Sequence, residues 1–421
     1  LTSGSGKTTV TLGLLRAMRR AGIGVNAAKS GPDYIDAAFL AAASGASAVN
    51  LDSHAMRRDL IRHLAGDRPE PRLLVEGVMG LFDGTDGGSG STASVAEALQ
   101  APVMLVLDAR HQGQTAAALA AGIATQLPDG VSLAGVVLNR IASPRHEELI
   151  SAALAERGIA LFGSLPANGD IEIPSRHLGL VQAADLAASG ALEPMIDKAA
   201  ELVAAHLDLG AIEAAFTVIA APAAGPALLP PPGQRIAIAR DAAFGFSYEH
   251  LMAGWRDTGA EIMYFSPLAD EAPPPNADFI FLPGGYPELH LPELSRAGNF
   301  LGGLRAAAER GTRIYGECGG YMVLGETIID AEGASYPMAG LLALETSFAN
   351  RKLHLGYRRM TPLAQAWPGL EPVTGHEFHY TSATRAEGDP LFAVSDAAGR
   401  DLGTMGLVRG SVAGSYAHII A

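Results

Sequence analysis

The sequence contains a single cysteine, Cys318, and lacks long hydrophobic runs. One cysteine excludes an intrachain disulfide and any metal site built from several cysteines. A lone thiol fits a reducing compartment, so we expect a cytoplasmic protein. No apolar run reaches the roughly 18 residues that predict a membrane span, and no signal-peptide pattern opens the chain. We therefore expect no membrane partner.

Basic residues are also scarce. The 30 Lys and Arg residues stand against 44 Asp and Glu residues, which gives a formal net charge of −14. Nucleic-acid binders normally carry a basic surface, so this balance argues against nucleic acid as a partner. It leaves anionic small molecules open, because local groups rather than the net charge hold such ligands.

The chain is long and apolar enough for more than one hydrophobic core. Its 421 residues are 48% hydrophobic, and at roughly 100–200 residues per domain this length predicts two or three domains. Residues 1–209 alternate apolar runs with Ala-rich helical stretches, which predicts a doubly wound parallel sheet. Its buried strands are expected at Leu73–Val75, Val103–Leu107 and Val136–Leu138.

A Pro-rich stretch at 220–234 has little periodicity and is typical of an extended linker. A new alternation of strands and helices begins at Arg235, with a strand expected at Phe279–Leu282 and another at Arg313–Tyr315. We therefore predict an α/β protein with two doubly wound domains, at 1–219 and 235–421, joined by this linker.

A glycine-rich loop precedes a helix that is expected to run through Arg19. Its backbone N–H groups and the helix N-terminus suit phosphate oxygens, with Lys7 reaching the β- and γ-phosphates and the Thr8 hydroxyl binding Mg²⁺. The full motif has glycine where Leu1 stands, and such a loop normally follows a buried strand, so we expect an N-terminally truncated chain. Thr2 replaces the lysine of partition-type switch ATPases. The loop residues are Ser3, Gly4, Ser5, Gly6, Lys7, Thr8 and Thr9.

Acidic residues follow two predicted strands near this loop. Glu76 ends the strand LLVE, where a carboxylate beside a phosphate loop is placed to bind Mg²⁺, although it also suits an ordinary strand end. Asp33 and Asp36 lie three residues apart and share a face if a helix starts there. They fit either a pair of metal ligands or an Asx turn that caps a helix.

Cys318 lies between glycines, in GECGG, directly after a predicted strand. Small neighbours permit the sharp turn that exposes a nucleophile between strand and helix, and a helix N-terminus acidifies a thiol. Another segment, GHEFHY at 375–380, combines two histidines with a glutamate. It suggests zinc, but a catalytic zinc needs three good ligands and an open position. A place near a glutamine pocket or a domain interface is the alternative.

Taken together, the motifs GSGKTT, GPDYIDAAFL, LDSHAM and VEGVMGLFDG, followed by an amidotransferase-like half, resemble the cobyrinic acid a,c-diamide synthase family. The resemblance covers essentially the whole chain. It implies a dethiobiotin-synthetase-like ATPase domain fused to a class I-type, flavodoxin-like glutamine amidotransferase domain. Members of the aerobic pathway act on hydrogenobyrinic acid, and the family amidates the a and c acetate side chains through an acyl phosphate.

The resemblance also implies roles for individual residues. Cys318 is expected to be the nucleophile and His418 the general base, although Ile420 stands where class I enzymes place the acid that orients the histidine. The remaining implied residues are Asn139 and Pro166 at the adenine, Thr8, Asp36 and Glu76 at Mg²⁺, Asp33, Tyr34 and Asp83 at the substrate, and Gly284, Gly285 and Gly319 at the oxyanion.

The expected reactants are therefore ATP, Mg²⁺, L-glutamine and a corrinoid, either hydrogenobyrinic or cobyrinic acid. A homodimer is a further expectation. Two alternatives stay open from the sequence. One is amidation of a related tetrapyrrole, such as a nickel sirohydrochlorin, and the other is a P-loop switch that carries an inactive amidotransferase module.

Overall fold

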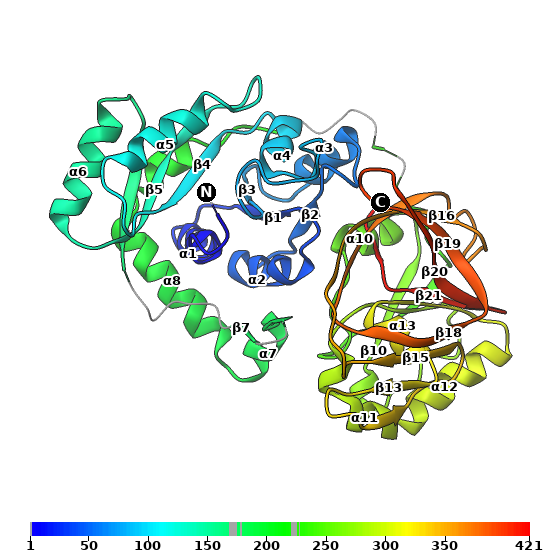
Figure 1. The fold of residues 1–421 in the computed structure, drawn as a ribbon. Helices are drawn as coiled ribbons and strands as arrows, with labels where there is room; N and C mark the ends of the chain where they lie inside the picture. Colours follow the sequence, from blue (N-terminus) through cyan, green and yellow to red (C-terminus); the bar gives the residue numbers. More distant parts are fainter. Residues whose placement is uncertain (1, 168–174, 177–178, 220–224, 227) are drawn as a thin grey trace. The chain divides into compact units, whose positions relative to one another are not determined.

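The computed structural model describes residues 2–167, 175–176, 179–219, 225–226 and 228–421. The chain divides into two compact units, Leu1–Pro226 and Ala227–Ala421, and each is described by itself (Figure 1). The predicted linker, 220–234, spans the boundary between them, and its residues 220–224 and 227 lie outside the described residues.

Unit 1 contains two three-stranded parallel sheets, in the orders β2-β1-β3 and β4-β5-β6. Helix α8 packs against α1, where Ala199 and Val203 closely approach Gly13 (Figure 1). The elements are α1 (Lys7–Arg20), β1 (Asn26–Ser30), α2 (Tyr34–Ser44), β2 (Val49–Leu51), α3 (Arg58–Gly66), β3 (Leu73–Glu76), α4 (Thr92–Leu99), β4 (Val103–Asp108), α5 (Thr115–Ala124), β5 (Leu133–Ile141), α6 (Pro144–Ala155), β6 (Leu161–Pro166), β7 (Ser175–Arg176), β8 (Gly179–Leu180), α7 (Ala183–Ala188), α8 (Leu192–His206) and α9 (Leu209–Ala214).

The two three-stranded sheets of unit 1 share no strand pairing among the described residues, whereas the sequence predicts one continuous sheet. An apolar pocket lies between β3 and β4, lined among others by Leu74, Val106 and Phe162, and it reaches Lys7 and Glu76. The phosphate loop enters α1 through a turn and a bend at residues 3–6.

Unit 2 is built on a ten-stranded mixed sheet. Its first five strands, β10-β9-β11-β12-β21, run parallel in the 2-1-3-4-5 order of flavodoxin-like folds. Five antiparallel strands extend this sheet in the order β20-β19-β16-β17-β22, and a smaller sheet has the order β14-β13-β15-β18. The α/β class and the parallel strands agree with the sequence prediction, but the antiparallel extension was not predicted.

The elements of unit 2 place the nucleophile candidate between β12 and α13. They are β9 (Arg235–Ala239), α10 (Glu249–Asp257), β10 (Glu261–Phe265), η1 (Pro267–Ala269), β11 (Phe279–Leu282), η2 (Pro287–Leu289), α11 (Leu291–Arg296), α12 (Gly298–Glu309), β12 (Arg313–Glu317), α13 (Gly319–Leu324), β13 (Thr327–Ile329), β14 (Ser335–Pro337), β15 (Ala343–Ser347), β16 (His354–Pro362), β17 (Val373–His379), β18 (Ser382–Glu387), β19 (Asp389–Ser395), β20 (Asp401–Arg409), β21 (Val412–Ser415) and β22 (His418–Ile419).

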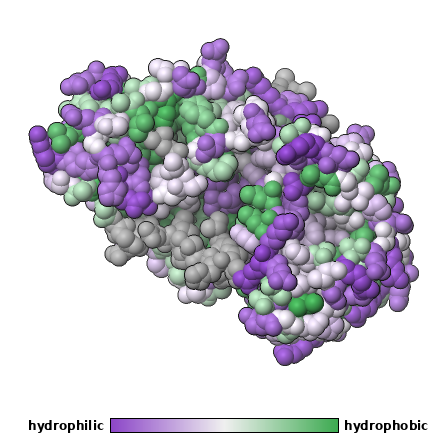
Figure 2. All heavy atoms as spheres, viewed as in Figure 1, coloured by the Kyte–Doolittle hydropathy of each residue, from purple (hydrophilic) through white to green (hydrophobic). Residues whose placement is uncertain are grey.

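Each unit has its own apolar core. Val137 and Phe162 pack against α1 and α8 in unit 1, and Phe244, Phe300 and Leu324 belong to the core of unit 2. On the face shown in Figure 2, hydrophilic residues cover much of the surface and hydrophobic ones form smaller groups. Among the described residues, no helix is both long enough and apolar enough to cross a membrane.

Candidate functional site

The phosphate loop of unit 1 leads directly into α1. Gly4 and Gly6 have φ angles of +75° and +88°, a left-handed conformation that favours glycine. A Cβ on Gly6 would lie 2.1 Å from Asn139 Nδ2, so a side chain at this position would displace the asparagine. The loop is therefore held in a conformation that only glycine adopts without strain, at a helix N-terminus that suits phosphate.

Two neighbours from β5 fix this loop. Asn139 Nδ2 donates to the carbonyl oxygen of Ser5 at 2.9 Å, and Arg140 Nη1 donates to that of Gly4 at 2.7 Å. Asn139 thus positions the loop, and its expected contact with adenine stays a prediction. Pro166, expected at the same base, ends β6 and pairs in register with Ile141.

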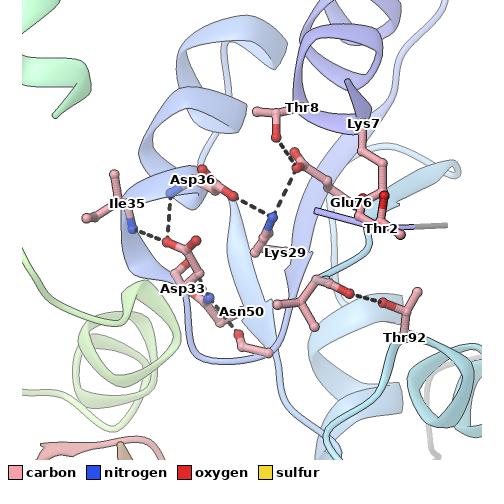
Figure 3. A network of polar contacts seen from close by, with 12 residues as sticks. Thr2, Lys7, Thr8, Lys29, Asp33, Ile35, Asp36, Asn50, Glu76 and Thr92 are labelled. Atoms are coloured by element: carbon pink, nitrogen blue, oxygen red, sulfur yellow. Dashed lines mark hydrogen bonds and ion pairs between the residues drawn. The ribbon is translucent and has the colours of Figure 1, made fainter. Parts of the chain in front are cut away.

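The acidic residues predicted from the sequence meet around a lysine (Figure 3). Lys29 of β1 is the register partner of Glu76 on the neighbouring parallel strand β3. Both side chains therefore lie on the same face of the sheet, near the carboxyl ends of the two strands. Lys29 Nζ lies 3.0 Å from Glu76 Oε1 and 2.5 Å from Asp36 Oδ2. Thr8 Oγ1 donates to Glu76 Oε1 at 2.6 Å. Sequence reasoning did not select Lys29, although its place at the strand exit just before GPDYID was a usable signal.

Burial and charge shift the pKa values of these groups. Burial raises the pKa of Glu76, although Lys29 counteracts it. Burial alone would lower the pKa of Lys29, but Glu76 and Asp36 reverse the effect and raise it. Burial and the charge of Lys29 lower the pKa of Lys7. Lys29 therefore stays protonated between Glu76 and Asp36.

Glu76 also has an atom that a cation would satisfy. Its Oε2 is enclosed and has no hydrogen-bond partner among the described residues. A buried carboxylate oxygen without a partner is costly, and a divalent cation removes that cost. Together with the Thr8 hydroxyl and the Asp36 carboxylate, this oxygen supplies the hard ligands that Mg²⁺ prefers, so the residues present fit the ion.

Asp33 and Asp36, for which the sequence allowed either a pair of metal ligands or a helix cap, have different contacts. Asp33 caps α2, because its Oδ1 accepts the N–H groups of Ile35 and Asp36 at 3.0 and 3.1 Å. The helix-cap interpretation therefore describes Asp33, while the Asp36 carboxylate alone reaches Lys29. Burial and the charge of Asp36 raise the pKa of Asp33.

Two further residues expected at the substrate lie near this cluster. Tyr34, in the first turn of α2, is buried. Asp83 is exposed, its Oδ2 accepts the N–H of Gly80 at 2.8 Å, and its charge acts on the pKa of Lys7. Their contacts with substrate stay predictions.

In unit 2, Cys318 occupies a sharp strand-to-helix turn. It follows β12 with φ +46° and ψ −106°, which is a strained conformation for a residue with a side chain. A Cβ on Gly316 would lie 2.7 Å from the carbonyl carbon of Gly320, and one on Gly320 would lie 2.0 Å from Leu282 O. Only glycine fits on either side, as the predicted nucleophile elbow requires.

The predicted base and oxyanion loop adjoin this elbow. A Cβ on Gly284 would lie 2.2 Å from His418 Cε1, 2.9 Å from its Nε2 and 3.2 Å from Cys318 Cβ. A Cβ on Gly319 would lie 3.1 Å from the backbone nitrogen of Gly285. The nucleophile, the histidine and the three glycines predicted from the sequence therefore lie together, although they come from separate elements.

The resting protonation of this site differs from the prediction of an acidified thiol. Burial, assisted by the charge of Glu288, raises the pKa of the Cys318 thiol. Burial lowers the pKa of His418 to about 3, with further contributions from His376 and His379. The helix that Cys318 caps has only six residues, so its dipole does not offset the enclosure of the sulfur. At neutral pH the proton therefore resides on the sulfur and the imidazole is neutral.

The GHEFHY segment forms β17 and part of an ion network. Ligand atoms of His354, Glu377 and His379 lie within 4.8 Å of one another. Glu377 is nevertheless already paired, with Arg358 Nε at 2.7 Å and His379 Nε2 at 2.8 Å, and His379 Nδ1 faces Thr381 O at 3.0 Å. A metal ion would compete with Arg358 for the carboxylate, so these contacts describe a buried ion network.

These two sites define the class of protein: a nucleotide-binding P-loop unit joined to an amidotransferase-type cysteine unit. Residues 1–181 match the family described as CobQ/CobB/MinD/ParA nucleotide binding domain, and residues 235–421 match the CobB/CobQ-like glutamine amidotransferase domain.

Relatives match over nearly the full length of the chain. A hydrogenobyrinate a,c-diamide synthase of Rhizobium meliloti is 52% identical over 99% of this chain and 97% of its own. The corresponding proteins of Brucella anthropi and Rhodobacter capsulatus are 51% and 50% identical, over 99% and 100% of this chain and 96% and 97% of theirs. The chain belongs to the hydrogenobyrinate a,c-diamide synthase family.

Proposed function

We propose that this chain is an ATP- and glutamine-dependent carbon–nitrogen ligase that amidates the a and c acetate side chains of hydrogenobyrinic acid in cobalamin biosynthesis. The observation that carries this proposal is that one chain holds both a phosphate-loop cluster and a cysteine–histidine elbow, in the domain order of its full-length relatives. Amide synthesis from a carboxylate needs both activities, because the acid must be activated and the nitrogen must arrive as ammonia.

The phosphate-loop unit activates the acid. A substrate carboxylate oxygen attacks the γ-phosphorus of ATP, ADP leaves, and an acyl phosphate forms. Ammonia then attacks the acyl carbon, and phosphate leaves with the former carboxylate oxygen. Lys7 neutralises the developing charge on the phosphoryl group, and the loop N–H groups hold it in place. Lys29, buried between Asp36 and Glu76, holds these two carboxylates in position.

Mg²⁺ belongs to this proposal. Thr8, Asp36 and Glu76 would hold it, as the unpartnered Oε2 of Glu76 supports. When bound, the ion supplies charge neutralisation at the phosphates. We assign Ser3–Thr9, Asn139 and Pro166 to the nucleotide, and Asp33, Tyr34 and Asp83 to the substrate.

The cysteine unit releases ammonia from glutamine. His418 accepts the thiol proton as the Cys318 sulfur attacks the amide carbon, and the same proton then leaves with the ammonia. Water hydrolyses the resulting thioester to glutamate. The N–H groups of the loop at Gly284 and Gly285, together with that of Gly319, stabilise the tetrahedral oxyanion. Removing one such donor typically costs about 3–4 kcal/mol.

Two broader assignments complete the proposal. ATP and glutamine are intracellular metabolites, so we place the reaction in the cytoplasm. We also propose a homodimer, which sedimentation of the purified protein tests directly.

Paired substitutions test the proposed function. Cys318→Ala is expected to abolish glutamine-dependent amidation of hydrogenobyrinic acid but to retain amidation at high ammonium. Lys7→Ala is expected to abolish both. Carboxylate labelled with ¹⁸O should transfer label to phosphate if an acyl phosphate forms. Product masses with hydrogenobyrinic acid, cobyrinic acid and nickel sirohydrochlorin identify the macrocycle. Full activity of Lys7→Ala, or phosphate without label, would remove the phosphorylation step.

A further inference from the structure

The residue two positions after the proposed base is Ile420, which cannot accept a hydrogen bond through its side chain. A histidine base needs such an acceptor, because the hydrogen bond at one ring nitrogen decides which nitrogen carries the proton. In this protein another acidic residue lies beside the imidazole. It is Glu317, the residue directly before Cys318.

The Glu317 carboxyl group links the strand of the nucleophile to the strand of the base. Its Oε1 accepts the N–H of Ile419 at 3.0 Å, and its Oε2 lies 3.7 Å from His418 Nδ1. The side chain of Glu317 is 5% exposed and that of His418 is fully buried. The carboxyl group is therefore fixed at one end by a backbone hydrogen bond and presents its other oxygen to the imidazole.

The other ring nitrogen faces the reaction. His418 Nε2 lies 2.9 Å from the position that a Cβ on Gly284 would take, and that same position is 3.2 Å from Cys318 Cβ. Nδ1 therefore points toward Glu317 while Nε2 points toward the oxyanion loop and the nucleophile. This is the orientation in which Nε2 receives the thiol proton.

We propose that Glu317 is the positioning residue of the glutaminase site, where it accepts a hydrogen bond from His418 Nδ1 and thereby keeps the Nε2 lone pair directed at Cys318. The inference rests on the proposed glutaminase function. A separation of 3.7 Å is longer than a hydrogen bond, and catalytic contacts of this kind commonly shorten when substrate binds. Class I enzymes place the orienting acid two residues after the histidine. Here Glu317, directly before the nucleophile Cys318, takes that role.

Two other acidic residues lie near the site, and neither forms an ion pair with His418 among the described residues. Glu377 binds Arg358 and His379, and no contact of Glu377 with the imidazole is among the described hydrogen bonds. Glu288 follows the oxyanion loop, and its charge acts on the Cys318 thiol. Glu317 is thus the carboxyl group that lies in an ion-pair geometry with His418.

The protonation of Glu317 adds a pH signature. Burial raises the pKa of Glu317 to about 8. A carboxyl group accepts the Nδ1–H in either form, but the ionised form stabilises the imidazolium that develops during thiol attack. Glutaminase activity is therefore expected to rise through this pH region. The other titratable or charged groups around the pair are Tyr315, Cys318, Glu288, Arg358, His376, Glu377, His379 and Tyr416.

The test compares Glu317→Gln with Glu317→Asp in glutaminase assays from pH 6 to 9.5. Glu317→Gln keeps the size of the side chain but removes the ionised form, and replacing a triad carboxylate by its amide lowers kcat by up to about 10⁴-fold. Because the resting contact here is long, we expect kcat to fall by at least about 10²-fold with little change in KM. The rise near pH 8 should disappear in this variant, and Glu317→Asp should restore part of the activity. Ammonium-driven amidation should stay at the unsubstituted level.

Two controls separate the possible failures. Glu332→Gln changes an exposed glutamate in a turn and should behave like the unsubstituted protein. Covalent labelling of Cys318 by 6-diazo-5-oxo-L-norleucine reports an intact glutamine pocket. If Glu317→Gln fails to fold, it loses this labelling, and the aspartate variant is used in its place. Unchanged kcat and an unchanged pH profile in Glu317→Gln would overturn the positioning role. Glutamine-dependent activity in Cys318→Ala would instead overturn the glutaminase function itself.

Discussion

Adding one methyl group at Gly284 should disable the glutaminase site selectively. The Cβ of an alanine there would lie 2.2 Å from His418 Cε1, 2.9 Å from Nε2 and 3.2 Å from Cys318 Cβ. Ordinary contact between carbon atoms begins at about 3.5 Å, so the ring or the loop must move by about 1.3 Å. His418 is fully buried, which leaves its ring little room to move away.

A displacement of this size has a predictable cost. Misplacing a catalytic group by about 1 Å typically lowers the rate by about 10²-fold, which corresponds to about 2.7 kcal/mol of transition-state stabilisation. We therefore expect Gly284→Ala to lose at least this much glutaminase kcat. Ammonium-driven amidation should be unaffected, because that route does not use the cysteine or the histidine.

The assay measures glutamate release and amide formation side by side, with glutamine and then with ammonium chloride. Gly302→Ala is the matched control, because a Cβ on this α12 glycine meets nothing within 4 Å. Glutaminase activity of Gly284→Ala within twofold of the control would refute the proposed placement of the base beside the oxyanion loop.

Three other predictions concern stability and nucleotide binding. Gly6→Ala forces a side chain into a φ of +88° and against Asn139, at about 1–2 kcal/mol for the backbone alone, so ATP affinity by calorimetry should fall at least tenfold while glutaminase activity persists. Lys29→Met leaves two carboxylates without their cation, which should destabilise unit 1 by about 3–5 kcal/mol in denaturant titrations and abolish both amidation routes. Because the folded pKa of Glu317, about 8, exceeds its ordinary value of 4.5, the protonated folded form is favoured at low pH and this stability is lost as pH rises toward 8. Glu317→Gln should therefore match the unsubstituted protein in thermal unfolding near pH 4.5 and exceed it above pH 8, by at most about 5 kcal/mol; an identical pH dependence of the two proteins would contradict the raised pKa.

The parallel strands were predictable because a strand that helices cover on both faces reads as a short apolar run. β4 and β11 are such runs, and their bounds agree with the prediction to within one residue. The antiparallel strands β16, β18 and β20 have several exposed positions, so polar and charged residues interrupt them, as in HLGYRRMTP. Such a pattern does not stand out from loops in a single sequence.

The positions of candidate site residues were predictable where a local motif fixes the backbone. Gly6, Lys7 and Cys318 lie in short motifs whose backbone geometry requires glycine. Lys29 and Glu317 were missed because their roles depend on a partner from another strand. Strand pairing, and with it the distance between such partners, is set by register and crossover connections, which spacing along one chain does not reveal.

The most direct test of the coupled reaction follows nitrogen from glutamine to product. Incubation of the protein with hydrogenobyrinic acid, ATP, Mg²⁺ and glutamine labelled with ¹⁵N at the amide should yield a diamide containing two ¹⁵N atoms, with two ADP formed for each diamide. In the presence of excess unlabelled ammonium, Cys318→Ala should give the same diamide without label. A product that lacks ¹⁵N in the unsubstituted protein, or amide formation without ADP, would contradict the joint action of the two sites.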